Sequence, residues 1–325
     1  MSAPLLSLRD LRVSFKTPNG LVQAVRGVDL DVMPGEMVGI VGESGSGKSV
    51  TFLGMLGLLP GTARMTGSAT VNGIEMVNAS NKTMRTIRGR QVAMIFQDPL
   101  SALNPVYRIG DQIVEMIREH QEMSKQAAMA LAVEMLGTVG IPQPATRAMQ
   151  YPHEFSGGMR QRAMIAMALS NDPDVLIADE PTTALDVTVQ AQILEVFQKI
   201  QREMNKAVVM ITHDLGVIAR VADRVQVMYA GRVVERATVD HLFEAPTHPY
   251  TVGLLHSLPR VGQERLLPIT GSPPNMLQPP PGCGFAARCE HSQPACEAAL
   301  PELVQFGDSM SACVRAADLY SEVAR

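Results

Sequence analysis

Tryptophan is absent from this 325-residue sequence, and aromatic residues make up only 4% of it. No stretch approaches the roughly 20 consecutive apolar residues that a membrane-spanning helix needs, so any membrane role is expected to come through a partner. The first residues also lack the basic and apolar regions of a signal peptide. Positive charge is not in excess, since the net charge is −4. This balance argues against an electrostatic nucleic-acid binder.

The remaining composition is that of a globular protein with a sizeable core. Hydrophobic residues account for 46% of the chain and charged residues for 18%. A chain of this length is expected to contain two structural units. Methionine is frequent, with 21 residues, and its adaptable side chain suits irregular cores and partner surfaces.

One stretch, residues 42–49, organises the interpretation of the whole chain. Its sequence GESGSGKS matches the phosphate-binding loop of nucleotide hydrolases. The apolar run at 37–41 predicts a buried parallel strand before the loop, and residues 49–59 are compatible with a helix behind it. Such a loop aims backbone N–H groups at a polyphosphate, with the lysine on the β- and γ-phosphates and the last hydroxyl on Mg²⁺. The residues expected to bind are Gly42, Ser44, Gly45, Ser46, Gly47, Lys48 and Ser49.

A second buried strand, at 175–180, ends in two adjacent carboxylates. Acidic residues at the carboxyl end of a parallel strand face the phosphate crevice. We therefore expect Asp179 to bind Mg²⁺, directly or through water, and Glu180 to act as the base that polarises the attacking water. An acidic turn after a core strand is the alternative.

Three further residues have two interpretations each when considered alone. Gln97 follows the strand predicted at 92–96. It either binds Mg²⁺ or orients a water molecule, or it is an ordinary turn residue. His213 follows the strand predicted at 207–212 and is either a γ-phosphate ligand or a structural histidine. Phe15, in an early alternating strand, either stacks on adenine or belongs to the core.

The middle of the chain has a helical pattern. Apolar residues recur at three- and four-residue spacing between 110 and 140, which predicts an inserted helical lobe. Ser156, Gly157 and Gly158 precede a helix predicted at about 159–170. Serine caps helices and glycine exposes N–H groups, so this step is a second candidate anion site or simply a capped helix start.

Together these motifs resemble the nucleotide-binding subunit of ABC transporters. The resemblance implies a P-loop NTPase of the α/β class, with a RecA-like core, an antiparallel β subdomain and an inserted α-helical subdomain, followed by a small cysteine-containing extension. The expected boundaries are 1–245 for the ATPase, with the helical subdomain at about 98–170, and 246–325 for the extension. The resemblance assigns roles to the Q-loop Gln97, the Walker B residues Asp179 and Glu180, the switch residue His213, the adenine-stacking Phe15, the D-loop Ala184-Leu185-Asp186 and the signature Phe155-Ser156-Gly157-Gly158-Met159, a variant of Leu-Ser-Gly-Gly-Gln.

The resemblance narrows to the ATPases of dipeptide, oligopeptide and nickel importers, and to the first of their two ATPase subunits. It is carried by residues 41–49, 96–99, 101–105 and 248–251 and by the cysteine tail. It implies ATP and Mg²⁺ as ligands, a second ABC ATPase as heterodimer partner, two membrane permeases and, indirectly, an extracytoplasmic binding protein. The chain is then a peripheral subunit on the cytoplasmic face of the cell membrane. Peptide, nickel and glutathione remain open as cargo, and the rival classes are an ABC ATPase acting on nucleic acid or ribosomes and a small-molecule kinase.

All four cysteines follow a proline-rich stretch at 268–281. Cys283, Cys289, Cys296 and Cys313 lack the tight pairs of a structural zinc site. Four thiolates at this wide spacing suit a [4Fe–4S] cluster about as well as a zinc ion. The resemblance to peptide-importer ATPases also implies such a cluster. An iron–sulfur cluster is the first expectation, zinc the second and independent buried thiols the third.

Overall fold

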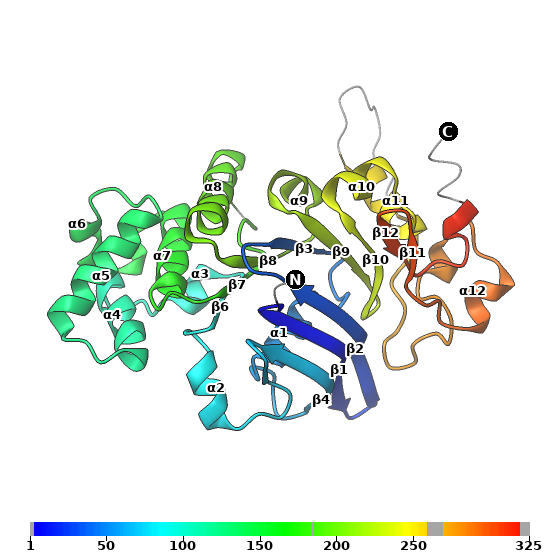
Figure 1. The fold of residues 1–325 in the computed structure, drawn as a ribbon, viewed down its shortest axis with the longest axis horizontal. Helices are drawn as coiled ribbons and strands as arrows, with labels where there is room; N and C mark the ends of the chain where they lie inside the picture. Colours follow the sequence, from blue (N-terminus) through cyan, green and yellow to red (C-terminus); the bar gives the residue numbers. More distant parts are fainter. Residues whose placement is uncertain (1–2, 184, 259–268, 319–325) are drawn as a thin grey trace.

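The computed structural model describes residues 3–183, 185–258 and 269–318, and these residues form two sheets surrounded by helices (Figure 1). The strands of the larger sheet are, in spatial order, β11 (Val304–Phe306), β12 (Ser309–Ser311), β10 (Arg232–Thr238), β9 (Arg224–Tyr229), β3 (Met37–Val41), β8 (Ala207–Thr212), β7 (Val175–Asp179) and β6 (Val92–Ile95). Strands β9, β3, β8, β7 and β6 are parallel to one another, whereas β10 pairs antiparallel with β9 and β12, and β12 pairs antiparallel with β11. The carboxyl ends of the parallel strands therefore meet at one edge of the sheet.

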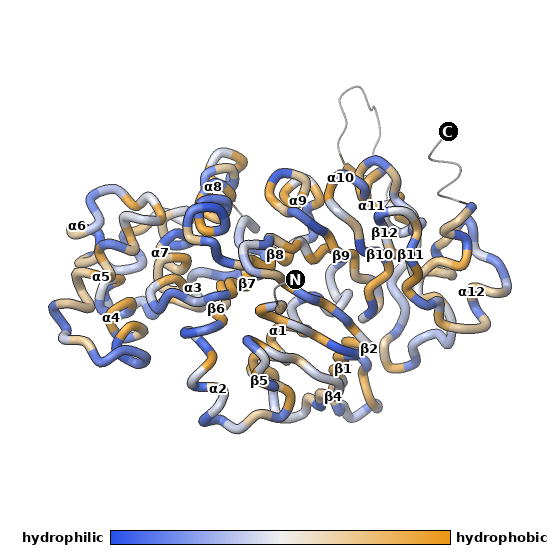
Figure 2. Tube along the Cα trace, in the orientation of Figure 1, coloured by the Kyte–Doolittle hydropathy of each residue, from blue (hydrophilic) through white to orange (hydrophobic). Residues whose placement is uncertain are grey.

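The parallel strands are buried on both faces, as their continuous apolar sequences predict. Successive residues of β3 belong to different hydrophobic clusters: Met37 and Val41 to one, Val38 and Ile40 to the other. The first cluster extends into the helical subdomain and the second into the antiparallel sheet. Figure 2 shows hydrophobic residues concentrated along the central strands. The sheet is thus the middle layer between the two cores.

The antiparallel sheet contains four strands within the described chain, β2 (Gly20–Val32), β1 (Leu6–Thr17), β4 (Ala63–Val71) and β5 (Ile74–Glu75). A hairpin turn at Asn72-Gly73 joins β4 to β5, and both turn residues have positive φ, as a type I′ turn requires. Helix α1 (Lys48–Met55) lies between β3 and β4 in the chain, and α2 (Asn81–Ile87) follows β5.

The helical lobe predicted after the first strands is present as α3 (Pro99–Ala102), α4 (Ile109–His120), α5 (Lys125–Thr138), α6 (Pro144–Ala148) and α7 (Gly157–Leu169), with the 3₁₀ turn η1 (Pro152–Glu154). Its helices bury the residues that their spacing predicted, such as Ile109, Ile113 and Ile117 of α4. Side chains of Ser124 and Ser156 cap α5 and α7.

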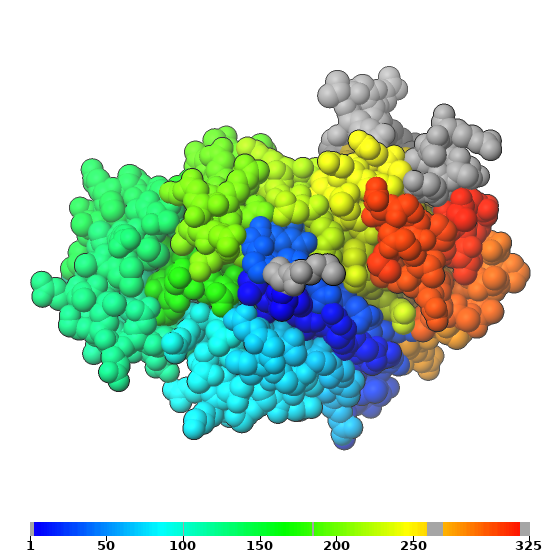
Figure 3. Space-filling view, viewed as in Figure 1, coloured from blue at the N-terminus to red at the C-terminus, as the bar shows by residue number. Residues whose placement is uncertain are grey.

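The last part of the chain adds strands to the larger sheet. Strand β12 pairs with β10, with Glu235 opposite Ser311, so the cysteine-containing extension shares a sheet with the ATPase fold. The helices of this half are α8 (Val187–Met204), α9 (Leu215–Val221), α10 (Val239–Glu244), α11 (Pro249–His256), the 3₁₀ turn η2 (Ala286–Arg288) and α12 (Pro294–Ala298). The extension and the helical subdomain lie at opposite ends of the molecule (Figure 3).

No helix among the described residues has the length and apolar character needed to cross a membrane.

Candidate nucleotide-hydrolysis site

The loop at 42–47 connects β3 to α1, which is the strand–loop–helix order that the sequence predicted. Glycine is required where the loop passes close to other backbone. Gly47 has φ 99°, and a Cβ there would lie 2.6 Å from the carbonyl oxygen of Ala24. Gly42 has φ 151°, and a Cβ there would overlap the carbonyl oxygen of Met228. Only glycine allows the loop to approach the neighbouring backbone so closely.

Lys48 is buried and bends back over this loop. Its Nζ donates to the carbonyl oxygens of Gly42, at 2.7 Å, and Glu43, at 3.0 Å. Burial lowers the pKa of the Lys48 amine from its ordinary value, although the carboxylates of Glu180 and Asp179 act in the opposite direction. The ammonium group therefore depends on nearby negative charge, which a polyphosphate supplies.

The hydroxyl of Ser49 and the carboxylate of Asp179 meet at the same place. Ser49 Oγ donates to Asp179 Oδ1 at 2.7 Å. Burial raises the pKa of Asp179, the hydrogen bond from Ser49 opposes this, and the neighbouring Glu180 raises it further. A hydroxyl and a carboxylate are the ligands that Mg²⁺ takes in nucleotide hydrolases. In the loop itself, the buried Oγ of Ser46 has no hydrogen-bond partner, so one donor remains for a ligand.

Two predicted catalytic residues, Gln97 and His213, both contact a third, Glu180. Gln97 Nε2 donates to Glu180 Oε2 at 2.9 Å, and His213 Nδ1 lies 3.2 Å from Glu180 Oε1. The Thr183 hydroxyl also donates to Oε2 at 2.9 Å. Glu180 has φ 47°, and its N–H donates to Ile211, so the backbone turns sharply after β7. The ends of β6, β7 and β8 thus converge on one carboxylate.

Other predicted residues lie elsewhere. Ser156 caps α7, and Gly157 and Gly158 form its first turn, in the helical subdomain rather than beside α1 in the centre of the molecule (Figure 1). Asp186 caps α8 by accepting the N–H of Val189. Ala184, the first residue of the expected D-loop, lies outside the described residues.

Phe15 is at the end of β1 and is half-buried against the core of the antiparallel sheet. This position leaves part of the ring accessible.

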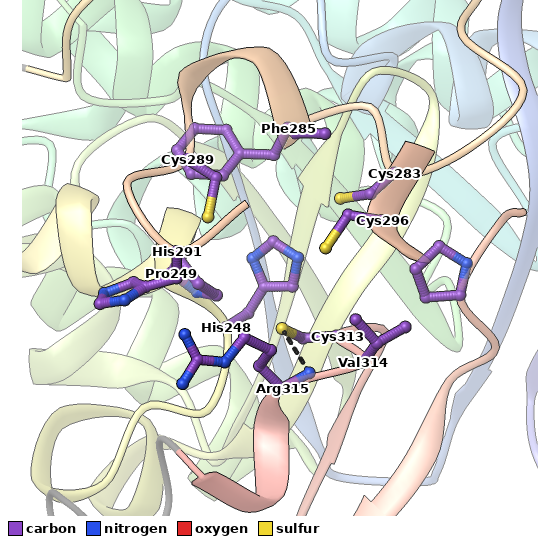
Figure 4. A pocket seen from close by; sticks show the side chains of 12 residues that line it. His248, Pro249, Cys283, Phe285, Cys289, His291, Cys296, Cys313, Val314 and Arg315 are labelled. Carbon is purple, nitrogen blue, oxygen red and sulfur yellow. Dashed lines mark hydrogen bonds between the residues drawn. The ribbon is translucent and has the colours of Figure 1, made fainter. Parts of the chain in front are cut away.

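The four cysteines line one small cavity in the extension. In Figure 4 the sulfur atoms of Cys283, Cys289, Cys296 and Cys313 point toward a common space beside His248. Burial raises the pKa of Cys283 and Cys289, and that of Cys313 to about 11. Within the described chain, no three His, Cys, Asp or Glu side chains are close enough together to hold a single metal ion.

Residues of the extension reach the nucleotide loop, which the sequence analysis did not foresee. The Tyr250 hydroxyl accepts the N–H of Glu43 at 2.7 Å, and Arg288 pairs with the Glu43 carboxylate at 2.7 and 3.0 Å. Both belong to segments that carried the family resemblance. The sequence did not indicate that either residue contacts Glu43, because Tyr250 and Arg288 lie 207 and 245 positions from it along the chain.

Comparison with known proteins agrees with this geometry. Residues 25–183 match the ABC transporter family, and residues 234–296 match the oligopeptide/dipeptide transporter C-terminal region. The sequence is 55% identical to the dipeptide transport ATP-binding protein DppD of Bacillus subtilis, over 94% of this chain and 92% of the relative. It is 50% identical to the oligopeptide transport ATP-binding protein OppD of Escherichia coli, over 91% and 89%. Among solved structures, a dimeric post-hydrolysis state of the ATP-binding cassette MJ0796 bound to ADP and Pi is similar, with TM-score 0.65, 27% identity and coverage of 72% and 98%.

Proposed function

The chain belongs to the family of ABC transporter ATPases, and on that premise we propose that it hydrolyses ATP to energise a membrane importer of di- and oligopeptides. The observation that carries this proposal is the convergence of Gln97 and His213 on Glu180, beside the Ser49–Asp179 pair. Similarity to both DppD and OppD proteins supports peptide cargo. Nickel and glutathione are the alternative cargoes.

Each group of the site has a role in this proposal. The loop N–H groups and Lys48 would hold the phosphates, and Ser49 and Asp179 would hold Mg²⁺, which would neutralise phosphate charge. Gln97 would bind the same Mg²⁺ or orient a water molecule. Glu180 would accept a proton from the attacking water, and His213 would hydrogen-bond to the γ-phosphate. The hydrogen bonds from Lys48 Nζ to the Gly42 and Glu43 carbonyls keep this ammonium group beside the loop.

The signature residues support a composite site. Ser156, Gly157 and Asp186 are exposed at the starts of α7 and α8. We infer that they complete the nucleotide site of a second, different ATPase, whose own signature completes this one. The γ-phosphate bridges the two subunits, so hydrolysis releases the clamp.

A groove between β6 and the helical subdomain provides a surface for a permease. It has a volume of about 310 Å³ and a largely apolar lining that includes Met94, Met116, Met164 and Met167. Methionine-rich surfaces adapt to partner helices. We propose that the permease pair docks here, at the cytoplasmic face of the membrane, so that movement of the helical subdomain is transmitted to it. The extracytoplasmic binding protein then acts through the permeases.

A matched pair of variants tests this docking surface. Met167→Glu places a charge in the groove and is expected to release the chain from detergent-solubilised permeases in a pull-down. Met149→Glu, at an exposed methionine outside the groove, is expected to leave assembly intact. Equal retention of both variants would contradict the assignment.

For the cysteine cavity we propose a [4Fe–4S] cluster, with zinc as the alternative and four independent thiols as the third outcome. Support comes from the shared cavity, since a cluster takes four thiolates. Burial favours protonated thiols, so a ligand must compensate the thiolate charge.

Anaerobic purification followed by iron, sulfide and zinc analysis distinguishes the three outcomes. About four irons and four sulfides per chain are expected, and Cys313→Ser should lower both. A folded, colourless and iron-free chain would remove the cluster from the proposal.

Reconstitution tests the main function. The chain, its partner ATPase, the permeases and the binding protein are placed in proteoliposomes, and uptake of labelled dipeptide, oligopeptide and nickel is measured with ATP. ATP-dependent peptide uptake is expected, and no uptake with Glu180→Gln. Uptake of nickel without uptake of peptides would show that nickel is the cargo. Transfer of phosphate from ATP to a soluble small molecule by the isolated chain would instead favour a kinase.

A further inference from the structure

The backbone N–H and the carboxylate of Glu43 are held by the C-terminal region, and its carbonyl oxygen is held by Lys48 of the same loop. Its backbone N–H donates to the Tyr250 hydroxyl at 2.7 Å. Its carboxylate pairs with Arg288, and its carbonyl oxygen accepts from Lys48 Nζ at 3.0 Å. Glu43 is the second residue of the phosphate-binding loop. The carbonyl that receives the phosphate-binding lysine therefore belongs to a residue anchored by the C-terminal region.

The Arg288 guanidinium is fully used in this anchor. Nη1 donates to Glu43 Oε2 and to the Tyr229 hydroxyl at 3.1 Å, and Nη2 donates to Glu43 Oε1 and the Ile269 carbonyl at 3.2 Å. Nε donates to the Thr270 carbonyl at 2.8 Å. All five N–H groups of arginine thus have acceptors, and the side chain is only 5% exposed. A partly buried, two-point pair of this kind fixes the geometry of both partners.

The segment that supplies Arg288 is also the segment that lines the cysteine cavity. Arg288 ends η2, Cys289 follows it directly, and Cys283 precedes the turn. Phe285, just before η2, packs on Tyr229 and Tyr250, with ring centroids 5.3 and 5.4 Å apart. The position of Arg288 therefore depends on how the cysteine segment is folded.

We propose that Arg288 is a positioning residue for the phosphate-binding loop, and that through it the cysteine segment sets the affinity of this chain for nucleotide. This inference rests on the proposed ATP-binding function. Loss of Arg288 leaves the Glu43 carboxylate without its partner, and the loop is free to move away from the conformation in which Lys48 faces the phosphates. A binding defect follows in a protein that is otherwise folded.

The structure offers a matched control at the opposite end of the same strand. The Arg224–Glu36 pair, 2.9 Å apart and also largely buried, precedes β3, whereas Glu43 follows β3. Removing Arg224 breaks a comparable ion pair without touching the phosphate-binding loop.

The experiment is calorimetric titration of ADP–Mg²⁺ into the full-length chain, with the melting temperature measured in parallel. Arg288→Gln is expected to weaken binding roughly tenfold, within the usual range of coupling between sites. Arg224→Gln is expected to lower the melting temperature and leave affinity unchanged. Glu43→Gln combined with Arg288→Gln should bind no more weakly than Arg288→Gln alone, because both changes remove one interaction.

A second variant tests the connection to the cysteines. Cys289→Ser is expected to weaken ADP–Mg²⁺ binding in the wild-type background and to add nothing in the Arg288→Gln background. Wild-type affinity in folded Arg288→Gln, or equal losses in Arg288→Gln and Arg224→Gln, would overturn the positioning role. Additive losses from Cys289→Ser and Arg288→Gln would overturn the connection. Failure of the wild-type chain to bind nucleotide would instead refute the proposed function.

Discussion

Gln97 donates its side-chain amide to the Glu180 carboxylate at 2.9 Å, although the two residues follow different strands and lie 83 positions apart. Glu180 is thereby held between Gln97 on one oxygen and His213 on the other. Its side chain is 17% exposed, so water still reaches it. A carboxylate oriented in this way suits the activation of a water molecule.

Glu180→Gln is therefore expected to retain nucleotide binding and lose steady-state hydrolysis by roughly a hundredfold or more, because the amide cannot accept a proton. Release of phosphate from the fully assembled importer measures hydrolysis, and a fluorescent ATP analogue measures binding. Turnover at the wild-type rate in the assembled complex would contradict the assignment of the base.

Gly47→Ala is expected to distort the phosphate-binding loop, since the added Cβ would lie 2.6 Å from the Ala24 carbonyl oxygen. Gly73→Ala is the matched control: its φ is also positive, at 76°, but no atom lies within 4 Å of the added Cβ. Both variants pay about 1 kcal/mol for the backbone conformation. Only Gly47→Ala should also lose nucleotide binding, and equal binding by both variants would show that the close approach is unimportant.

The cap of the signature helix provides a third prediction. Ser156→Ala and Ser124→Ala each remove a helix cap, at α7 and α5, and should cost about 1 kcal/mol of stability. If Ser156 contacts the nucleotide bound by a partner ATPase, Ser156→Ala lowers ATP hydrolysis by the assembled importer and Ser124→Ala does not. Both variants, as isolated chains, are expected to bind ATP normally. A similar loss of hydrolysis in both variants would reduce the role of Ser156 to helix capping.

Glu235 gives a prediction about pH. Burial raises its pKa above the ordinary 4.5, although Thr247 and the His248 N–H donate hydrogen bonds to it. Above pH 4.5 the folded state therefore holds this proton more tightly than the unfolded state, and the free energy of unfolding falls as pH rises. The stability of the wild type relative to Glu235→Gln should decrease from about pH 4.5 upward, as measured by urea unfolding at several pH values.

Glu75 is the control of opposite sign. Burial acts to raise its pKa, but hydrogen bonds from Ser68 and the Ala69, Met76 and Val77 N–H groups outweigh this and lower it below 4.5. Its stabilisation is present above that pH and is lost on acidification. The difference between wild type and Glu75→Gln should therefore grow as pH rises through the acid range. If the stability difference between wild type and variant changed with pH in the same direction for Glu235→Gln and Glu75→Gln, the opposite pKa shifts of the two glutamates would be contradicted.

Much of the fold was predictable because its signals are local. The strand predicted at 37–41 is β3, the strand predicted at 175–180 is β7, and the helix predicted at about 159–170 is α7. Strands β11 and β12 were not predicted from the sequence, because each has only three residues and little alternation of apolar and polar side chains. They form because β10 leaves an edge for β12 to pair with.

A nucleotide loop, and strand ends that carry acid, amide and imidazole groups, could be predicted from the sequence because glycine spacing and buried strands are properties of short segments. The meeting of Gln97, Glu180 and His213 could not, since it depends on the order of β6, β7 and β8 in the folded sheet. The pairing of Arg288 with Glu43 is likewise a result of the tertiary fold. An ion pair between an extension and a loop 245 residues away depends on how the intervening chain folds, and no local pattern records it.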